Sequence, residues 1–264
     1  MLTEVRNQFR ISFMSIKYAV IREMLNKVTF LTNTLFMILN NASFILQWLV
    51  FFSLKDNFGG YSLNQVLLLW GLASGTYGVS HFFFKNAYKL SDIINTGKLD
   101  SYLVQPKNVL LSVITADVST SAIGDILYAI IILIFASNSI LQALLFLVFC
   151  ITGGLIITAF TIIVESLGFW FGKSDVLADT LITSSISFST YPEGIFKGLI
   201  KSLLYIIVPV GITAYIPIKI IVSYKIWLFI AVILSTIAFI SLAFYIFYKG
   251  LKRYSSSNLM IARI

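Results

Sequence analysis

The stretch VLLSVITADVSTSAIGDILYAIIILIFASNSILQALLFLVFCITGGLIITAFTIIV, residues 109–164, decides the fold of this chain. It contains only two charged residues, Asp117 and Asp125. A helix needs about 20 apolar residues to cross the hydrocarbon layer, and at about 1.5 Å per residue this stretch is too long for one crossing. It must therefore fold back, and Ser137-Asn138-Ser139 is the polar break suited to the turn. We expect two membrane spans here, at residues 109–136 and 140–164.

The composition of the whole chain agrees with a membrane protein. Of its 264 residues, 58% are hydrophobic and 11% charged, against about 45–50% and about 25% in a soluble domain. So few charges cannot cover a water-exposed surface. The net charge of +8 does not indicate nucleic acid, because the aromatic residues lie in charge-free runs and the basic residues lie between them. The single cysteine, Cys150, excludes a disulfide framework and a thiol metal cluster.

Three further runs predict spans. Residues 28–54 and 57–84 contain no Asp, Glu, Lys or Arg, and residues 226–248 form the last apolar run. The stretch at 55–60, between the first two runs, is a short turn. Basic residues gather before the first run and after the last, which places both termini in the cytoplasm and makes the number of spans even. These basic residues are Arg6, Arg10, Lys17, Arg22, Lys27, Lys249, Lys252, Arg253 and Arg263. We therefore expect an all-α integral membrane fold with six transmembrane helices in one domain, residues 1–264.

The fifth span has two possible positions. Either residues 176–191 cross and residues 193–225 dip back from outside as a re-entrant helical hairpin, or residues 202–222 cross. Charge counting favours the second, because it places Lys197 and Lys201 inside. Three prolines, Pro192, Pro209 and Pro217, break the region into short pieces, which a membrane accepts only where protein or a cavity shields the backbone. We adopt the re-entrant interpretation, which the family resemblance described below also favours.

Residues 1–27 form a separate element. Apolar residues recur at helical spacing, with the basic residues largely elsewhere, as in an amphipathic helix lying along the inner headgroups. The apolar residues are Val5, Phe9, Phe13, Ile16 and Val20. The segment lacks the apolar core and cleavage site of a signal peptide. We predict an interfacial helix that contacts the lipid bilayer.

The loop at residues 86–108 is the most informative polar segment. Residues 88–96 can form a short helix, Gly97 can cap it, residues 98–104 can form a second turn, and Pro106 stops it. Five apolar residues give it an apolar side outside the bilayer: Leu90, Ile93, Ile94, Leu99 and Leu103. This side would either lie on lipid or dock a cytosolic partner.

The two acids of the opening stretch have two readings. On one helix, Asp117 and Asp125 are offset by about 80° and share a broad side with Ser121. They would form a proton or ion relay, or make polar contacts between helices. No Lys or Arg stands at a matching depth in the runs.

Catalytic and cofactor motifs are missing from the sequence. Gly168 to Ser174 looks like a phosphate-binding loop, but it has three residues between its glycines where such a loop needs four. A lipid-modifying enzyme would depend on acids near the inner face without a histidine beside them, namely Asp92, Asp100, Glu165 and Asp175. We expect no catalytic residue, no cofactor and no metal site in this chain.

Three dispersed motifs carry a family resemblance. INTGKLDSYLVQP, residues 94–106, resembles the I-x-x-G-x-L-D-x-x-L-x-x-P segment of permease subunits in the type-2 exporter class of ABC transporters. The bacterial branch also shows a Tyr-Pro after span five, similar to Tyr191-Pro192 with IVPV at 207–210 and AYIP at 214–217. Its G-L-x-x-Y-S-S tail is similar to residues 250–256. In the wider class a basic-acid pair precedes span five, and Lys173-Ser174-Asp175 is similar to it, with Lys in place of the usual Arg.

The resemblance implies a membrane subunit of an ATP-driven ABC exporter in the bacterial cytoplasmic membrane. It implies six helices, a second permease that is identical or homologous, and two copies of a cytosolic ABC ATPase that bind the ATP and Mg²⁺. The exported compound would be hydrophobic or amphipathic, a lipid or a peptide. The residues that would couple to the ATPase are Leu90, Ile93, Ile94, Gly97, Lys98, Leu99, Asp100, Leu103 and Pro106. Those of the re-entrant region above the pathway are Tyr191, Pro192, Pro209 and Pro217.

Two other functions stay open. The first is an ion-coupled carrier that uses Asp117 and Asp125, and the second is a membrane enzyme that modifies lipids. Dependence on an ATPase would separate the exporter from both.

Overall fold

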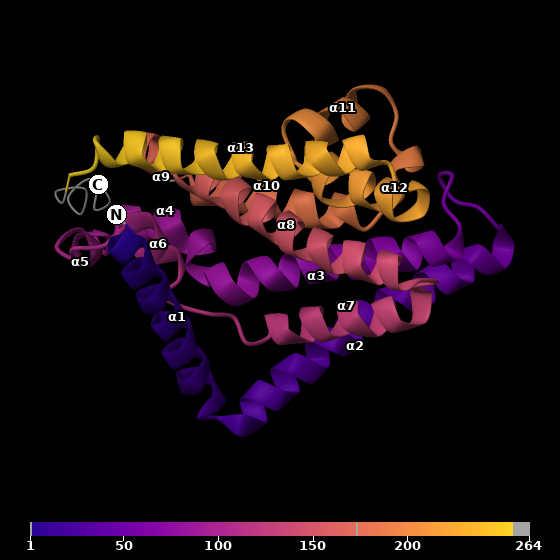
Figure 1. The fold of residues 1–264 in the computed structure, drawn as a ribbon, viewed down its shortest axis with the longest axis horizontal. Helices are drawn as coiled ribbons and strands as arrows, with labels where there is room; N and C mark the ends of the chain where they lie inside the picture. The colour runs from indigo at the N-terminus through magenta and orange to yellow at the C-terminus, as the bar shows by residue number, and fades with distance from the viewer. Residues whose placement is uncertain (1, 173, 256–264) are drawn as a thin grey trace.

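A computed structural model describes residues 2–172 and 174–255, and within them the regular elements are helices, with one isolated bridge between Phe58 and Tyr61. Figure 1 shows long helices lying roughly side by side, with short helices gathered at both ends of the bundle. The longer helices are α1 (Leu2–Met24), α2 (Lys27–Leu54), α3 (Leu63–Phe84), α7 (Ala122–Ala136), α8 (Ile140–Glu165), α10 (Asp175–Ser189) and α13 (Ile226–Leu251). The shorter ones are η1 (Lys85–Lys89), α4 (Leu90–Asn95), α5 (Asp100–Leu103), α6 (Val109–Ile114), α9 (Gly168–Phe171), η2 (Glu193–Ile195), α11 (Gly198–Ile206), η3 (Gly211–Tyr215) and α12 (Ile216–Ser223).

Four helical segments of the described residues are long and apolar enough to cross a membrane. They are Lys27–Leu54, Leu63–Asn95, Ile140–Phe171 and Ile226–Leu251. A fifth is added if the bent pair Gly198–Ile206 and Gly211–Ser223 counts as one span. The chain is therefore a multi-pass membrane protein with four or five such helices, where the sequence predicted six.

The expected span at residues 109–136 is not one helix. It consists of α6 and α7, separated by a non-helical segment at 115–121. Hydroxyl and carboxylate side chains fill this segment, and such side chains compete with the backbone for helical hydrogen bonds. Ser119 and Ser121 bond to each other there, at 2.9 Å between their Oγ atoms. α7 alone has 15 residues and extends only about 22 Å, short of the roughly 30 Å hydrocarbon layer.

One end of the bundle, which we call the turn end, collects residues 55–62, 137–139 and 190–225. A side chain on Gly194 would collide with the backbone of Gly59, so these two turns touch. Ser139 and Tyr224 place their hydroxyl oxygens 3.4 Å apart, and Gln142 donates to the Ile221 carbonyl at 3.4 Å. The predicted turns at 55–60 and 137–139 are thus breaks between helices and lie together.

The opposite end, which we call the loop end, collects residues 85–108, 165–172, 174 and 252–255. Asn108 donates its backbone N–H to Gln8 of α1 at 2.9 Å. Tyr254, after α13, donates to Asp100 at 2.8 Å. Figure 1 shows the start of α1 and the end of α13 beside α4, α5 and α6.

α3 is the central helix of the bundle, packed against α7 and α8. A Cβ on Gly71 would lie 2.7 Å from Ile132 of α7, and one on Gly75 would lie 2.5 Å from the Cys150 sulfur of α8. These glycines therefore allow the backbones to approach closely, as small residues do where membrane helices pack. α2 is more peripheral, and only Thr34, Asn41 and Trp48 are buried along it.

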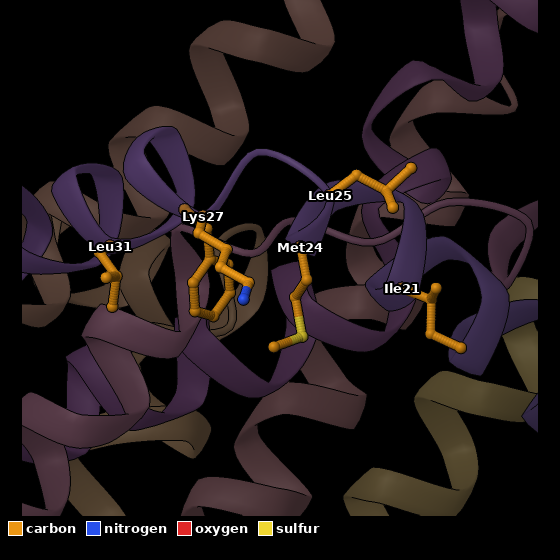
Figure 2. Close-up of a pocket in the computed structure, with 6 residues that line it drawn as sticks. Ile21, Met24, Leu25, Lys27 and Leu31 are labelled. Carbon is orange, nitrogen blue, oxygen red and sulfur yellow. The ribbon is translucent and has the colours of Figure 1, made fainter.

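α1 leaves the bundle and meets α2 at a sharp elbow (Figure 1). Phe9 and Phe13 are exposed on it, Ile16 and Val20 are half-buried, and the side chain of Val5 lies outside the described part of the chain. The interfacial position of this helix stays a prediction. Figure 2 shows Ile21 and Met24 from α1 and Lys27 and Leu31 from α2 at the elbow, where they line an open hollow of about 400 Å³. An apolar hollow with one Lys suits the boundary between acyl chains and headgroups.

Candidate functional site

The predicted loop at residues 86–108 is a folded unit with two short helices, α4 and α5, joined at Gly97. Gly97 has φ +72°, a left-handed conformation that favours glycine, so it does end the first helix as expected. The backbone N–H of Gly97 donates to the Ile94 carbonyl at 3.3 Å. The chain then turns through Pro106 into α6.

The expectation of an exposed apolar side on this loop is wrong for four of its five residues. Leu90, Ile93, Ile94 and Leu99 are 0–6% exposed and belong to a hydrophobic cluster with Phe169 of α9, Phe247 of α13 and Leu110 of α6. The loop folds back onto these helices because its apolar residues are buried more completely there than they would be on lipid. Leu103 remains exposed, at 39%.

A buried carboxylate anchors α4 to the rest of the chain. Glu165, at the end of α8, accepts the backbone N–H of Ser91 at 2.8 Å. The Ser91 hydroxyl lies 3.1 Å from that of Ser174, and Asn95 donates to the Gly172 carbonyl. The loop is therefore tied to the connection between α8 and α10. The sequence placed Glu165 at the inner face but did not reveal this contact; Lys173 of the basic-acid pair lies outside the described residues.

Two of the motifs behind the resemblance touch each other. Tyr254 of the C-terminal motif donates its hydroxyl to Asp100 of the loop motif at 2.8 Å. Burial and the neighbouring Asp100 carboxylate raise the pKa of Tyr254 to about 12, so it stays a donor at neutral pH. Ser256 of the same motif lies outside the described residues.

The solvent-facing part of the loop is mostly polar. Lys98 pairs with Asp92 at 3.1 Å, and both side chains are more than half exposed. Val104 is 84% exposed, the most exposed apolar residue of the loop. We call the exposed residues the loop surface: Lys89, Asp92, Thr96, Lys98, Ser101, Leu103, Val104 and Pro106.

Asp117 is an anchor for α1. Its carboxylate lies 2.5 Å from Arg22 of α1 and 3.0 Å from Lys85 of η1. Both cations come from outside the apolar runs, and the path of α1 brings Arg22 to this carboxylate. Asp117 also lies in the break before α7, so it does not share a helix with Asp125.

Asp125 makes a polar contact between helices. It is 8% exposed, and it accepts hydrogen bonds from Asn41 of α2 at 2.7 Å and Ser74 of α3 at 3.2 Å. Neither it nor any other acidic residue of the described chain belongs to a group of three or more potential metal ligands. The polar-contact reading of Asp125 agrees with this geometry.

The re-entrant residues lie together at the turn end, organised by Glu193. This buried carboxylate accepts hydrogen bonds from Lys201 of α11 at 2.9 Å, Lys219 of α12 at 2.5 Å and Tyr205 at 2.9 Å. α11 and the segment of η3 and α12 are bent by 82° relative to each other. Pro192 begins the region, Pro209 lies at the bend and Pro217 in the first turn of α12, while Tyr191 packs its ring against Trp48 of α2.

Acidification should loosen this region. Burial raises the pKa of Glu193, but the hydrogen bonds from Lys219, Lys201 and Tyr205 lower it by more than burial raises it. The pKa therefore lies below its usual 4.5. The stability that ionised Glu193 contributes to this region is therefore fully present above pH 4.5, and it is lost as the pH falls through the folded-state pKa. We expect hydrogen exchange of residues 198–223 to accelerate on acidification.

Glu193→Gln should accelerate the hydrogen exchange of residues 198–223 at neutral pH, because it lowers the free energy of local opening by about 1 kcal/mol. In this variant, acidification should no longer accelerate the exchange. Lys197→Gln removes one charge of opposite sign from the same region without touching these bonds, and it should behave as wild type. An unchanged acid response in Glu193→Gln would show that another group titrates.

Comparison with known proteins identifies the family. Residues 37–258 match the family described as ABC-2 family transporter protein. No curated protein and no solved structure matches the chain. The match begins within α2 and runs through α13, and it includes the loop, the Tyr-Pro and the C-terminal motifs, so the resemblance read from those motifs is confirmed. The chain therefore belongs to the ABC-2 transporter family, as a membrane permease of that type.

Proposed function

We propose that this permease is the membrane subunit of an ATP-driven exporter for a hydrophobic or amphipathic compound, and that a separate cytosolic ATPase docks on the loop surface. The observation that carries the proposal is the way the loop is built. Leu90, Ile93, Ile94 and Leu99 are buried in the chain itself, and Glu165 and Tyr254 hold the two halves of the loop. The loop surface is mostly polar, with Leu103 and Val104 as its exposed aliphatic side chains. A force on the loop surface would reach α8, α10 and α13 through these contacts.

The proposal assigns ATP and Mg²⁺ to the ATPase and no catalytic residue to this chain. It also includes a second permease, identical or homologous, two ATPase copies, and residence in the bacterial cytoplasmic membrane. An unpaired membrane face supports the second permease: α2 exposes Leu35, Phe36, Leu39 and Leu46 along its length. An ion relay has less support, because Asp117 is paired with two cations and Asp125 with neutral donors.

We further propose six passages through the membrane, with α10 as the fifth and residues 193–225 as a re-entrant region. The segments before and after α10 belong to opposite ends of the bundle, and both α11 and α12 bond to Glu193 at the turn end. α13 then returns to the loop end. Only five of the 19 Lys and Arg residues belong to the segments of the turn end, so this end faces outward: Lys55, Lys197, Lys201, Lys219 and Lys225.

Cysteine labelling tests this topology. In a Cys150→Ser background, single cysteines at Asn57, Asn138 and Lys197 should react with an impermeant thiol reagent from outside the cell. A cysteine at Ser101 should react only after the membrane is opened. All four positions are exposed in the fold. Protection of Lys197→Cys from outside, with labelling from the cytoplasm, would select residues 202–222 as the fifth span.

The function itself is tested by reconstitution with a cytosolic ABC ATPase that co-purifies with this chain. ATP hydrolysis by the purified complex and ATP-dependent uptake into inverted vesicles should both require the two proteins. Transport that follows a proton gradient without the ATPase, and that is lost in Asp125→Asn, would instead support the ion-coupled carrier.

A further inference from the structure

A cavity of about 420 Å³ lies between α2, α3, α10 and the start of α7. This volume is in the range of sites that bind drug-sized molecules. Phe44 and Tyr191, which are each 41% exposed, and the exposed Ser187 all belong to its wall. These residues come from α2 and from the C-terminal end of α10, so the cavity opens sideways between those two helices.

Asp125 supplies the only carboxylate of the wall, and no Lys or Arg lines it. The hydrogen bonds from Asn41 and Ser74 both go to Oδ1. Among the described residues, Oδ2 accepts no hydrogen bond, and no cation pairs with this carboxylate. A buried carboxylate in a membrane protein is costly unless a positive charge faces it. The position of Asp125 therefore leaves room for a cation that the chain does not provide.

The rest of the wall suits an apolar or aromatic body. Phe44 and Trp70 stack with their ring centroids 5.0 Å apart and extend the wall from α2 to α3. Tyr77 and Tyr191 add two more rings. Aromatic faces attract cations, most strongly where water is excluded. His81, the one basic side chain of the wall, lies against the rings of Tyr77 and Tyr88.

We propose that this cavity binds a drug-sized hydrophobic cation, whose charge faces Asp125 and whose body lies against Phe44 and Trp70. The inference rests on the proposed function, because it names the class of compound that the permease would export. A molecule of this class partitions into the bilayer and reaches the cavity through the opening between α2 and α10.

The test uses the full chain in phosphatidylcholine nanodiscs, without ATPase or ATP. Equilibrium dialysis measures binding of tetraphenylphosphonium and of tetraphenylborate, which have the same shape and opposite charge, with empty nanodiscs subtracted. We expect saturable binding of the cation alone. Asp125→Asn should weaken that binding at least about tenfold, since a close charge pair contributes more than the free energy of one tenfold step.

Three further variants separate charge from folding. Asp125→Glu keeps the carboxylate and should retain binding. Asp179→Asn removes an exposed acid of α10 that lies outside the cavity wall, and it should bind as wild type. Ser187→Trp keeps Asp125 and narrows the opening, so it should weaken binding as well.

Equal binding of both probes, or undiminished cation binding by a folded Asp125→Asn variant, would overturn the proposal. If Asp125→Asn does not fold, undiminished binding by Ser187→Trp, or loss of binding in a folded Asp179→Asn variant, would overturn it. Because binding is measured without the ATPase, a failure here leaves ATP-coupled transport standing. If the cation binds but transport does not depend on the ATPase, the proposed function is refuted and the cation site still stands.

Discussion

Leu99→Asp should unfold the loop end of the protein, at a cost of about 4 kcal/mol or more. Leu99 is fully buried and belongs to the cluster that joins the loop to α6, α9 and α13. A carboxylate at this position would lose its hydration without gaining a cation. Purified Leu99→Asp protein should melt at a much lower temperature than wild type in the same detergent, and residues 85–108 should be cleaved first by protease.

Val104→Asp is the matched control, because it introduces the same charge on the same loop at a side chain that is 84% exposed. It should leave the melting temperature unchanged. If the ATPase docks on the loop surface, Val104→Asp should release it in co-purification while the permease stays folded. A stable Leu99→Asp variant would contradict the buried position of Leu99. A folded Val104→Asp variant with full ATPase binding would remove Val104 from the docking surface.

Gly75→Leu should disrupt the centre of the bundle, at a cost of about 3 kcal/mol or more. A Cβ at this position lies 2.5 Å from the Cys150 sulfur and 3.0 Å from the Ala129 Cβ. These neighbours belong to α8 and α7, so a large side chain would push α3 away from both helices. The yield of monodisperse protein and its melting temperature should both fall sharply.

A double variant isolates the cause of that loss. Gly75→Ala should destabilise the protein less than Gly75→Leu. Adding Cys150→Ala to Gly75→Ala should recover part of the stability that Gly75→Ala loses, because it removes the sulfur that the new methyl group meets. Strictly additive effects of Gly75→Ala and Cys150→Ala would show that the sulfur is not the obstacle.

The loop motif illustrates how far residue pattern can lead. Gly97 was expected to cap a helix, and its positive φ agrees, since that conformation is a local property of the chain. The direction of Leu90, Ile93, Ile94 and Leu99 was expected to be outward, and they point into the protein. Periodicity identifies an apolar face but not what covers it, because the covering helices α9 and α13 follow much later in the sequence.

The intramembrane acids show the same limit. Their rarity in an apolar stretch marked Asp117 and Asp125 as notable, since a charge in the membrane needs a partner. The partners come from distant segments: Arg22 and Lys85 for Asp117, and Asn41 for Asp125. The wall of the cavity beside Asp125 is formed by α2, α3, α7 and α10 together, so the pattern of one segment could not predict it.

The sequence by itself determined the membrane environment, the helical class, the turns at 55–60 and 137–139, and the transporter family. These follow from local hydropathy, from backbone preferences and from short motifs, which are properties of neighbouring residues. Only the tertiary structure decided that residues 109–136 break into two helices, that Glu165 and Tyr254 anchor the loop, and that Asp125 faces a cavity. Each of these depends on contacts between residues far apart in the chain, and such contacts form only when the helices pack.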